Sequence, residues 1–222
     1  LIIFLILQIK KLLNQKEGLL SDVSHELRTP LNGILGFTDL LKSSHFGAIN
    51  ETQSDFLSQI ESSGKHLLEL ISGLLDVAKI DSGSMEIDLQ SCKPKDIFYE
   101  VVGLIQPQLV EKKLQLKQLI DPTVETVVCD MRKVKQILVN LLSNAIKYTP
   151  ENGIIELVIT MENGFTKVIV SDNGIGISKA DQEIIFDEFA QANRSRDEAL
   201  GGTGIGLALS RRLVELHGGE IG

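Results

Sequence analysis

The chain has 222 residues, of which 43% are hydrophobic and 23% are charged, and its formal net charge at pH 7 is −8. This length allows one large or two small domains, each with a core of its own. The acidic balance, without a basic cluster to neutralise phosphates, argues against a general nucleic-acid-binding protein. Cys92 and Cys129 lack metal-ligand spacing, so we interpret them as reduced thiols.

The chain begins with an apolar run over residues 1–7, followed by Lys10 and Lys11. The run is too short to span a bilayer, which needs ~20 apolar residues, and it lacks the cleavage site of a signal peptide. Two interpretations of residues 1–20 stay open, and both can hold in succession along one signalling helix. One is the cytoplasmic end of a transmembrane helix, marked by the two lysines. The other is a coiled coil, because apolar residues recur at alternating spacings of four and three.

Two long helical patterns follow within residues 21–84, with a turn over residues 45–50 between them. Asn50 or Thr52 is expected to cap the second helix, and Gly83 to end it. One hairpin cannot bury the wide apolar stripe of this second helix, whereas two paired hairpins can. We therefore predict a homodimer with a four-helix bundle. The stripe consists of Phe56, Leu57, Ile60, Leu67, Leu68, Ile71, Leu74, Leu75 and Ala78.

Beyond this hairpin the pattern becomes mixed. Residues 85–92 are expected to form a linker and a first strand, with residues 85–89 alternating like a strand. In residues 93–222, helices are predicted over residues 96–113, bent or interrupted at Pro107, over residues 130–147, capped by Asp130, and over residues 205–217. Extended segments are predicted over residues 114–120, 154–161 and 166–171, and Asn163-Gly164 favours an antiparallel hairpin.

These elements define a fold class. We predict an all-α helical hairpin that forms a dimeric four-helix bundle, followed by an α/β sandwich in which helices cover one face of a mixed sheet. The helix over residues 130–147 is expected to direct these side chains into the core: Val134, Ile137, Leu138, Leu141, Leu142 and Ala145.

The first motif lies in residues 24–31, Ser-His-Glu-Leu-Arg-Thr-Pro-Leu. A histidine ring is largely neutral near pH 7 and can act as a nucleophile, and the adjacent Glu26 can accept the proton from the other ring nitrogen of His25. Thr29 shares the helical face of His25. Pro30 cannot donate to the carbonyl of Glu26, so we expect the helix to kink or loosen there. We interpret the remaining histidines as solvated surface residues: His45, His66 and His217.

Three later segments suit a nucleotide, although the chain has neither a P-loop nor Rossmann spacing. In residues 140–147, Asn140, Asn144 and Lys147 project from one helical face; asparagine oxygens can complete an Mg²⁺ shell, and lysine can pair with phosphate. In residues 172–176, Asp172 ends a strand, where it can accept from an adenine amino group, and two glycines follow. The glycine cluster of residues 201–207 opens the last helix, whose free N–H groups suit a polyphosphate.

Together these motifs resemble the catalytic core of sensor histidine kinases, beyond about residue 15. Residues 21–84 are similar to the dimerisation and phosphoacceptor domain. Residues 93–222 are similar to the GHKL-type, or Bergerat-type, ATP-binding domain that is shared with Hsp90, gyrase B and MutL. The resemblance implies ATP and Mg²⁺ as cofactors, His25 as phosphoacceptor, Glu26 as its acid–base partner and Asn144 as metal ligand. The nucleotide-binding residues that it implies are Asn140, Asn144, Lys147, Tyr148, Asp172, Gly174, Gly176, Phe189, Gly202, Thr203, Gly204, Gly206 and Leu207.

The resemblance also implies a reaction and partners. His25 would be phosphorylated from ATP and would pass the phosphoryl group to an aspartate of a response regulator, and Thr29 implies phosphatase activity toward that regulator. Residues 186–189 resemble the phenylalanine box before a mobile ATP lid, in which Arg194 and Arg196 either contact the γ-phosphate or are solvated. A homodimer, an upstream sensor domain, contact with the membrane through segments outside this chain, and a cytoplasmic location beneath an inner membrane are implied as well.

Two features bear on the alternatives. Relatives that hydrolyse ATP carry a glutamate where this chain has Asn140, which is a poor base, and this opposes a GHKL ATPase or chaperone. The motif around His25 opposes an anti-sigma serine kinase; a nucleotide-binding scaffold without phosphotransfer stays open.

Similar domains continue past residues 219–222 into a further strand, so we expect the ATP-binding domain to be truncated at its C-terminus.

Overall fold

The computed structural model describes residues 23–43, 45–190 and 203–222. The chain divides into two compact units, Leu1–Glu86 and Ile87–Gly222. The signalling helix predicted for residues 1–20 lies outside the described residues. Within the described ranges, no helix has both the length and the apolar character that crossing a membrane requires.

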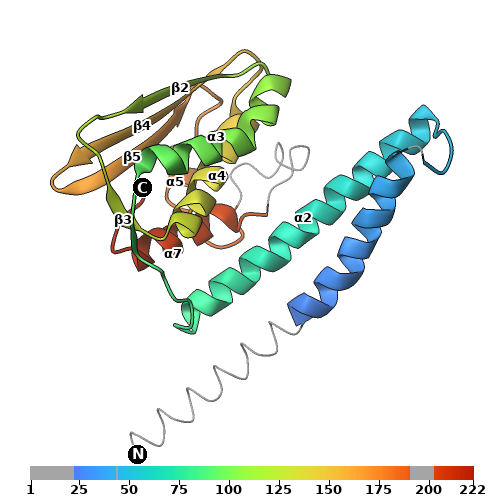
Figure 1. Cartoon of the computed structure of the whole chain (residues 1–222), viewed down its shortest axis with the longest axis horizontal. Coiled ribbons are helices and arrows are strands. Elements are labelled where there is room, and N and C mark those ends of the chain that lie inside the picture. Colours follow the sequence, from blue (N-terminus) through green and yellow to red (C-terminus); the bar gives the residue numbers. More distant parts are fainter. Residues whose placement is uncertain (1–22, 44, 191–202) are drawn as a thin grey trace, which may run out of the picture. The chain divides into compact units, whose positions relative to one another are not determined.

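The first unit is a helical hairpin (Figure 1). Its first helix covers residues 23–42 and continues through Pro30 without a break. Its second helix, α2, spans Glu51–Asp81 and begins with a capping box, in which Gln53 N donates to Asn50 Oδ1 over 2.8 Å and Asn50 N donates to Gln53 Oε1 over 2.9 Å. The predicted Asn50 cap is therefore confirmed.

An ion pair joins the two helices of this hairpin. Lys42 Nζ lies 2.7 Å from Glu61 Oε2, and Lys65 pairs with the other oxygen of the same carboxylate. Hydrogen bonds from Lys42 and Lys65, together with their charges, lower the pKa of Glu61 to about 2. The helices also approach closely, because a Cβ added at Gly64 would lie 2.7 Å from Leu35 Cδ2.

The second unit is an α/β sandwich. Its elements are β1 Gln90–Cys92, α3 Pro94–Glu111, β2 Gln115–Ile120, β3 Val127–Cys129, α4 Met131–Tyr148, β4 Ile154–Glu162, β5 Phe165–Asp172, α5 Lys179–Gln182 and α7 Gly206–Leu216. In the larger sheet, β4 pairs with β2 in parallel and with β5 antiparallel, while β1 and β3 form a small antiparallel sheet. The mixed sheet and the hairpin at Asn163-Gly164 are thus as predicted.

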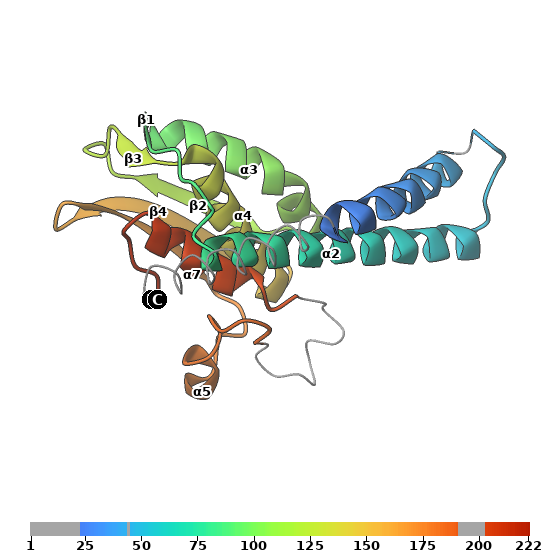
Figure 2. The same cartoon turned by 90° about the horizontal axis from the view of Figure 1, so that it is seen from below.

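The core of this unit lies between the larger sheet and its helices. Along β4, Ile155, Leu157 and Ile159 are fully buried and alternate with less buried residues, as expected for a strand with one covered face. Helices α3, α4 and α7 lie together on one side of the sheet (Figure 1). Figure 2 shows the short helix α5 projecting away from this helical layer, and none of its residues is buried.

Two local predictions need correction, and two short elements were not predicted. The first strand lies within residues 85–92 but not over the alternating residues 85–89, because pairing begins only at Gln90 and Asp88 N donates to the carboxylate of Asp130 over 3.2 Å instead. Of the bend or interruption expected at Pro107, the interruption is absent, because α3 continues through this residue on its exposed side, where water can satisfy the carbonyl that the proline leaves free. β3 and α5 were not predicted, since a strand of three residues and a helix of four give too weak a pattern.

The two cysteines lie on the small sheet. Cys92 and Cys129 are buried and free. Burial, with a contribution from Cys92, raises the pKa of Cys129 to about 12, which makes its thiol a poor nucleophile at neutral pH. Both cysteines therefore pack as small residues of the core.

His217 also differs from expectation, because it is half-buried and joins α7 to α4 rather than lying solvated on the surface. Its Nδ1 lies 2.7 Å from the carbonyl oxygen of Leu213 and must donate to it, so Nε2 accepts from Asp130 N over 3.1 Å. Asp130 is 4% exposed, and no local signal in the sequence reveals this pairing across 87 positions.

Replacing His217 with alanine should therefore destabilise the second unit. The buried N–H of Asp130 would lose its acceptor, and an unsatisfied buried donor costs about 1–3 kcal/mol. Urea unfolding measures this loss. His45→Ala is the matched control, since His45 is exposed and its removal should change the free energy of unfolding by less than about 0.5 kcal/mol. Equal losses in both variants would contradict the assigned role of His217.

Candidate functional site

A cavity of about 690 Å³ opens between α4, the loop after β5, α5 and the start of α7. This size lies in the range typical of sites for small molecules and cofactors. Gly174 and Phe189 are not among its lining residues, and Gly202 lies outside the described part of the chain. The predicted nucleotide-binding residues that line the cavity are Asn140, Asn144, Lys147, Tyr148, Asp172, Gly176, Thr203, Gly204, Gly206 and Leu207.

Helix α4 contributes one wall of the cavity, and both of its ends are fixed. At its start, Asp130 Oδ1 accepts from Arg132 N over 2.9 Å and from Lys133 N over 3.2 Å. Burial would raise the pKa of Asp130, but the hydrogen bonds from three backbone N–H groups outweigh it and lower the pKa. At its end, Lys112 Nζ donates to the carbonyl oxygens of Ile146, Lys147 and Thr149 over 2.8, 2.9 and 3.1 Å.

Helix α4 presents both polar and apolar side chains to the cavity. Lys147 Nζ lies 2.9 Å from Tyr148 Oη, so the two side chains are ordered together. Leu141, which we expected in the core, is half-buried and lines the cavity instead, whereas Leu138 and Leu142 face the core as predicted. The spacing of four and three that joins Asn140, Asn144 and Lys147 in the sequence therefore does bring them to one cavity.

The loop after β5 lies close against the end of α4 at Gly174. Gly174 N donates to Asp172 Oδ1 over 2.8 Å, which leaves the other carboxylate oxygen of Asp172 for a ligand. A Cβ at Gly174 would lie only 2.5 Å from the carbonyl oxygen of Tyr148. Gly174 thus acts by allowing this close backbone approach and not by lining the cavity.

The turn over residues 186–190 is joined to the segment that leads into α7. Phe189 N donates to Gly204 O over 3.0 Å. Gly204 has φ +66° and packs against the backbone of Phe189, because a Cβ added at Gly204 would lie 2.8 Å from Phe189 C. The Phe189 side chain is 57% exposed. The aromatic residue of this turn that lines the cavity is Phe186.

The apolar part of the lining was missed by the sequence reasoning. Ile175 and Ile177 alternate with Gly176 in the loop after β5, and the other apolar lining residues that were not predicted include Val170, Ile185 and Phe186. The nucleotide-binding residues implied by the motifs are mostly glycines and polar residues and do not include these apolar side chains. An alternation of isoleucine with glycine outside a strand was the available signal, since apolar walls suit an aromatic base.

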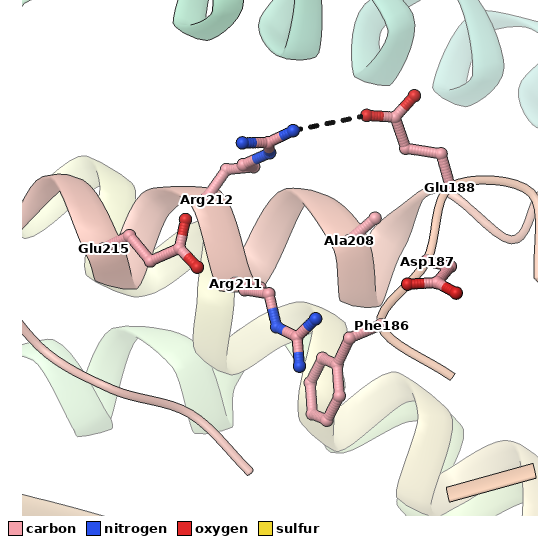
Figure 3. Close-up of a pocket in the computed structure, with 7 residues that line it drawn as sticks. All are labelled: Phe186, Asp187, Glu188, Ala208, Arg211, Arg212 and Glu215. Atoms are coloured by element: carbon pink, nitrogen blue, oxygen red, sulfur yellow. Dashed lines mark ion pairs between the residues drawn. The ribbon is translucent and has the colours of Figure 1, made fainter. Parts of the chain in front are cut away.

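Phe186 also contacts α7. It also lines a second cavity of about 350 Å³ against α7, with Asp187, Glu188, Ala208, Arg211, Arg212 and Glu215. Figure 3 shows the guanidinium of Arg211 over the Phe186 ring, 4.7 Å from its centroid, and the ion pair between Arg212 and Glu188 with an N–O distance of 3.9 Å. A cation over an aromatic face is attractive, so α7 helps to fix the turn that carries Phe186.

The candidate nucleophile belongs to the helical unit. His25, Glu26 and Thr29 are all exposed on the helix over residues 23–42. Thr29 Oγ1 donates to the backbone carbonyl of His25 over 3.0 Å, so the threonine hydroxyl lies one helical turn from His25 and its oxygen can still accept a hydrogen bond. Within the described residues, no group of three or more histidine, cysteine or acidic side chains could hold a metal ion.

Two family descriptions match the chain. Residues 15–83 match "His Kinase A (phospho-acceptor) domain" and residues 129–222 match "Histidine kinase-, DNA gyrase B-, and HSP90-like ATPase". The sensor-like histidine kinase R01002 of Rhizobium meliloti is 37% identical over 207 residues, and sensor protein GacS of Pseudomonas syringae is 40% identical over 212 residues. Each match covers 93% of this chain but only 39% and 23% of those proteins.

A solved structure agrees with these matches. Full-length ShkA in complex with AMPPNP superposes with a TM-score of 0.73 at 30% identity, over 90% of this chain and 41% of that one. The fold, the cavity and the exposed histidine all fit the same assignment. The chain therefore belongs to the histidine kinases and carries both domains of their catalytic core, a phospho-acceptor domain followed by an ATP-binding domain.

Proposed function

We propose that this chain transfers the γ-phosphoryl group of ATP to a ring nitrogen of His25, and then to an aspartate of a response regulator. The observation that carries the proposal is the presence, in one chain, of an exposed histidine in a phospho-acceptor domain and of a nucleotide-sized cavity lined by Asn140, Asn144 and Lys147. Incubation with Mg²⁺ and γ-labelled ATP tests it: the chain should acquire a label that is stable in base and labile in acid.

The residue roles follow the chemistry of the cavity. The free oxygen of Asp172 would accept from the adenine amino group, the apolar lining around Ile175 and Phe186 would enclose the base, and Lys147 would pair with phosphate. ShkA, a relative of this chain, was solved with the ATP analogue AMPPNP, which supports ATP as the ligand. Glu26, adjacent to His25, would accept the ring proton that is released when the other nitrogen attacks phosphorus.

The lining also fits Mg²⁺. The α4 side chains that line the cavity include the amides of Asn140 and Asn144, and the part of the chain described here offers no carboxylate cage. Mg²⁺ commonly binds through one or two protein ligands together with substrate phosphates, so Asn144, assisted by Asn140, would hold an ion that arrives with the nucleotide. When bound, such an ion neutralises charge on the phosphate oxygens.

The helical unit supports a homodimer. Large apolar side chains remain exposed along both helices of the hairpin, and a four-helix bundle of two hairpins would bury them. The expected stripe on α2 is only partly covered within one chain. The residues that are at least 44% exposed include Leu27, Ile34, Leu41, Phe56, Ile60, Leu67 and Leu74. The upstream sensor domain and the attachment to a membrane remain predictions.

Asn140 is expected to suppress hydrolysis of ATP. An amide cannot activate water as a glutamate would, so ATP is left for attack by His25. Asn140→Glu should therefore raise release of inorganic phosphate at least about tenfold, since a well-placed general base contributes about 10²–10⁴-fold. Asn140→Gln, which changes length without adding a base, is the control. Equal phosphate release by both variants would count against this explanation.

A second activity, phosphatase action on the phosphorylated regulator, is favoured by the exposed Thr29 hydroxyl one helical turn from His25. Its oxygen can position a water molecule for attack on an aspartyl phosphate. Thr29→Ala should slow regulator dephosphorylation about ten- to a hundredfold, as expected for loss of one positioning contact, while phosphorylation of His25 changes little. Thr29→Ser, which keeps the hydroxyl, should retain most of the activity. Unchanged dephosphorylation in Thr29→Ala would remove this proposal.

A further inference from the structure

Asn140 is linked to Ser210, a residue that does not line the nucleotide cavity. Asn140 lies on α4 and Ser210 on α7, and Asn140 Nδ2 donates to Ser210 Oγ over 2.8 Å. Ser210 is 2% exposed, so water cannot readily replace this acceptor. We propose that Ser210 is a positioning residue for Asn140: it holds the side-chain amide so that the carbonyl oxygen, and not the NH₂ group, is presented to the nucleotide.

The surroundings of the amide oxygen agree with the same orientation. A Cβ added at Gly206 would lie 2.2 Å from Asn140 Oδ1, so the amide oxygen lies against the backbone of Gly206, the first residue of α7. The N–H groups of the first helical turn have no partner within a helix, and this end of a helix is positive. An oxygen is therefore favoured there over an NH₂ group. Ser210 attracts the nitrogen of the amide, and the start of α7 attracts its oxygen.

This orientation decides what Asn140 can offer in the cavity, which both Asn140 and Gly206 line. A carbonyl oxygen can serve as a ligand of a hard cation or accept from water on it, whereas an NH₂ group could only donate to phosphate. The inference rests on the proposed function and specifies it: the Ser210 contact should matter when nucleotide binds with Mg²⁺ and should matter little when nucleotide binds without it.

A double-mutant cycle on the full chain tests this. The affinity for AMPPNP would be measured by calorimetry, in Mg²⁺ and in EDTA, for the wild type, Ser210→Ala, Asn140→Ala and the double variant. In Mg²⁺, Ser210→Ala should weaken binding about five- to tenfold in the wild-type background, as loss of one neutral hydrogen bond implies. The loss should be less than about twofold in the Asn140→Ala background, and also in EDTA.

The outcomes separate the two proposals. Equal losses from Ser210→Ala in both backgrounds, or equal losses with and without Mg²⁺, would overturn the role of Ser210 while leaving nucleotide binding intact. Absence of AMPPNP binding by the wild type would instead overturn the proposed function, and this inference with it. Ser210→Cys, which keeps the side-chain shape with a somewhat larger atom that is a weak acceptor, has the same expected result and replaces Ser210→Ala if that variant does not fold.

Discussion

Replacing His25 with glutamine should abolish phosphorylation of the chain while its affinity for ATP stays unchanged. The glutamine amide cannot attack phosphorus, so the rate should fall by more than about 1000-fold, as when an enzyme loses its nucleophile. The fold should survive, because His25 is exposed on a helix and glutamine is a good helix former. The measurement is base-stable, acid-labile label from γ-labelled ATP, with nucleotide affinity determined on the same preparation.

Two further variants make this result specific. His66→Gln changes another histidine of the same helical hairpin and should leave the label intact. Glu26→Gln should slow labelling about 10²–10⁴-fold without abolishing it, since general-base assistance is worth that much. Label retained in His25→Gln would identify a different acceptor. A wild-type chain that binds ATP yet acquires no label would favour a scaffold that binds nucleotide without phosphotransfer.

Much of the fold followed from local patterns. Apolar residues repeating along α2 predicted a long helix, and Asn50 marked its start, because caps and helical periodicity are properties of neighbouring residues. The hairpin of β4 and β5 was equally accessible, since Asn163-Gly164 directly specifies the turn. The Asn140, Asn144 and Lys147 set was found for the same reason, because residues three or four apart share a helical face.

The parts that escaped prediction depend on pairs distant in sequence. His217 accepts from Asp130, Lys112 caps the carbonyl end of α4, and Ser210 holds Asn140. Each of these side chains is unremarkable among its own neighbours, and its role exists only once two helices are packed together. Residues 85–89 show the opposite case: they alternate like a strand, but within the described ranges no strand pairs with them, and alternation alone does not create a sheet.

Gly174→Ala is the second change for which we expect a large effect. The new Cβ would lie 2.5 Å from the carbonyl oxygen of Tyr148 and 2.7 Å from Asp172 Oδ1, and backbone atoms cannot move aside as a flexible side chain can. Either the loop after β5 separates from the end of α4, or the end of α4 shifts. Overpacking of this kind costs about 1–3 kcal/mol. Because Tyr148 and Asp172 both line the cavity, nucleotide affinity should fall at least about tenfold, the equivalent of about 1.4 kcal/mol.

Alanine substitutions at two other glycines distinguish steric overlap from the effect of backbone conformation. Gly103 lies exposed within α3 with nothing within 4 Å of a new Cβ, so Gly103→Ala should stabilise the chain by about 0.5–1 kcal/mol through helix propensity. Gly176 has φ +69° and open space around it, so Gly176→Ala should cost about 1 kcal/mol from backbone conformation alone.

Urea unfolding and nucleotide affinity should therefore rank Gly174→Ala as the most damaging, Gly176→Ala as intermediate and Gly103→Ala as harmless. If Gly174→Ala behaved like Gly103→Ala, the close approach to Tyr148 would not be what holds Asp172 at the cavity. The attachment of the loop to α4 would then rest on the hydrogen bond from Ile175 N to the Tyr148 carbonyl oxygen, which is long at 3.4 Å.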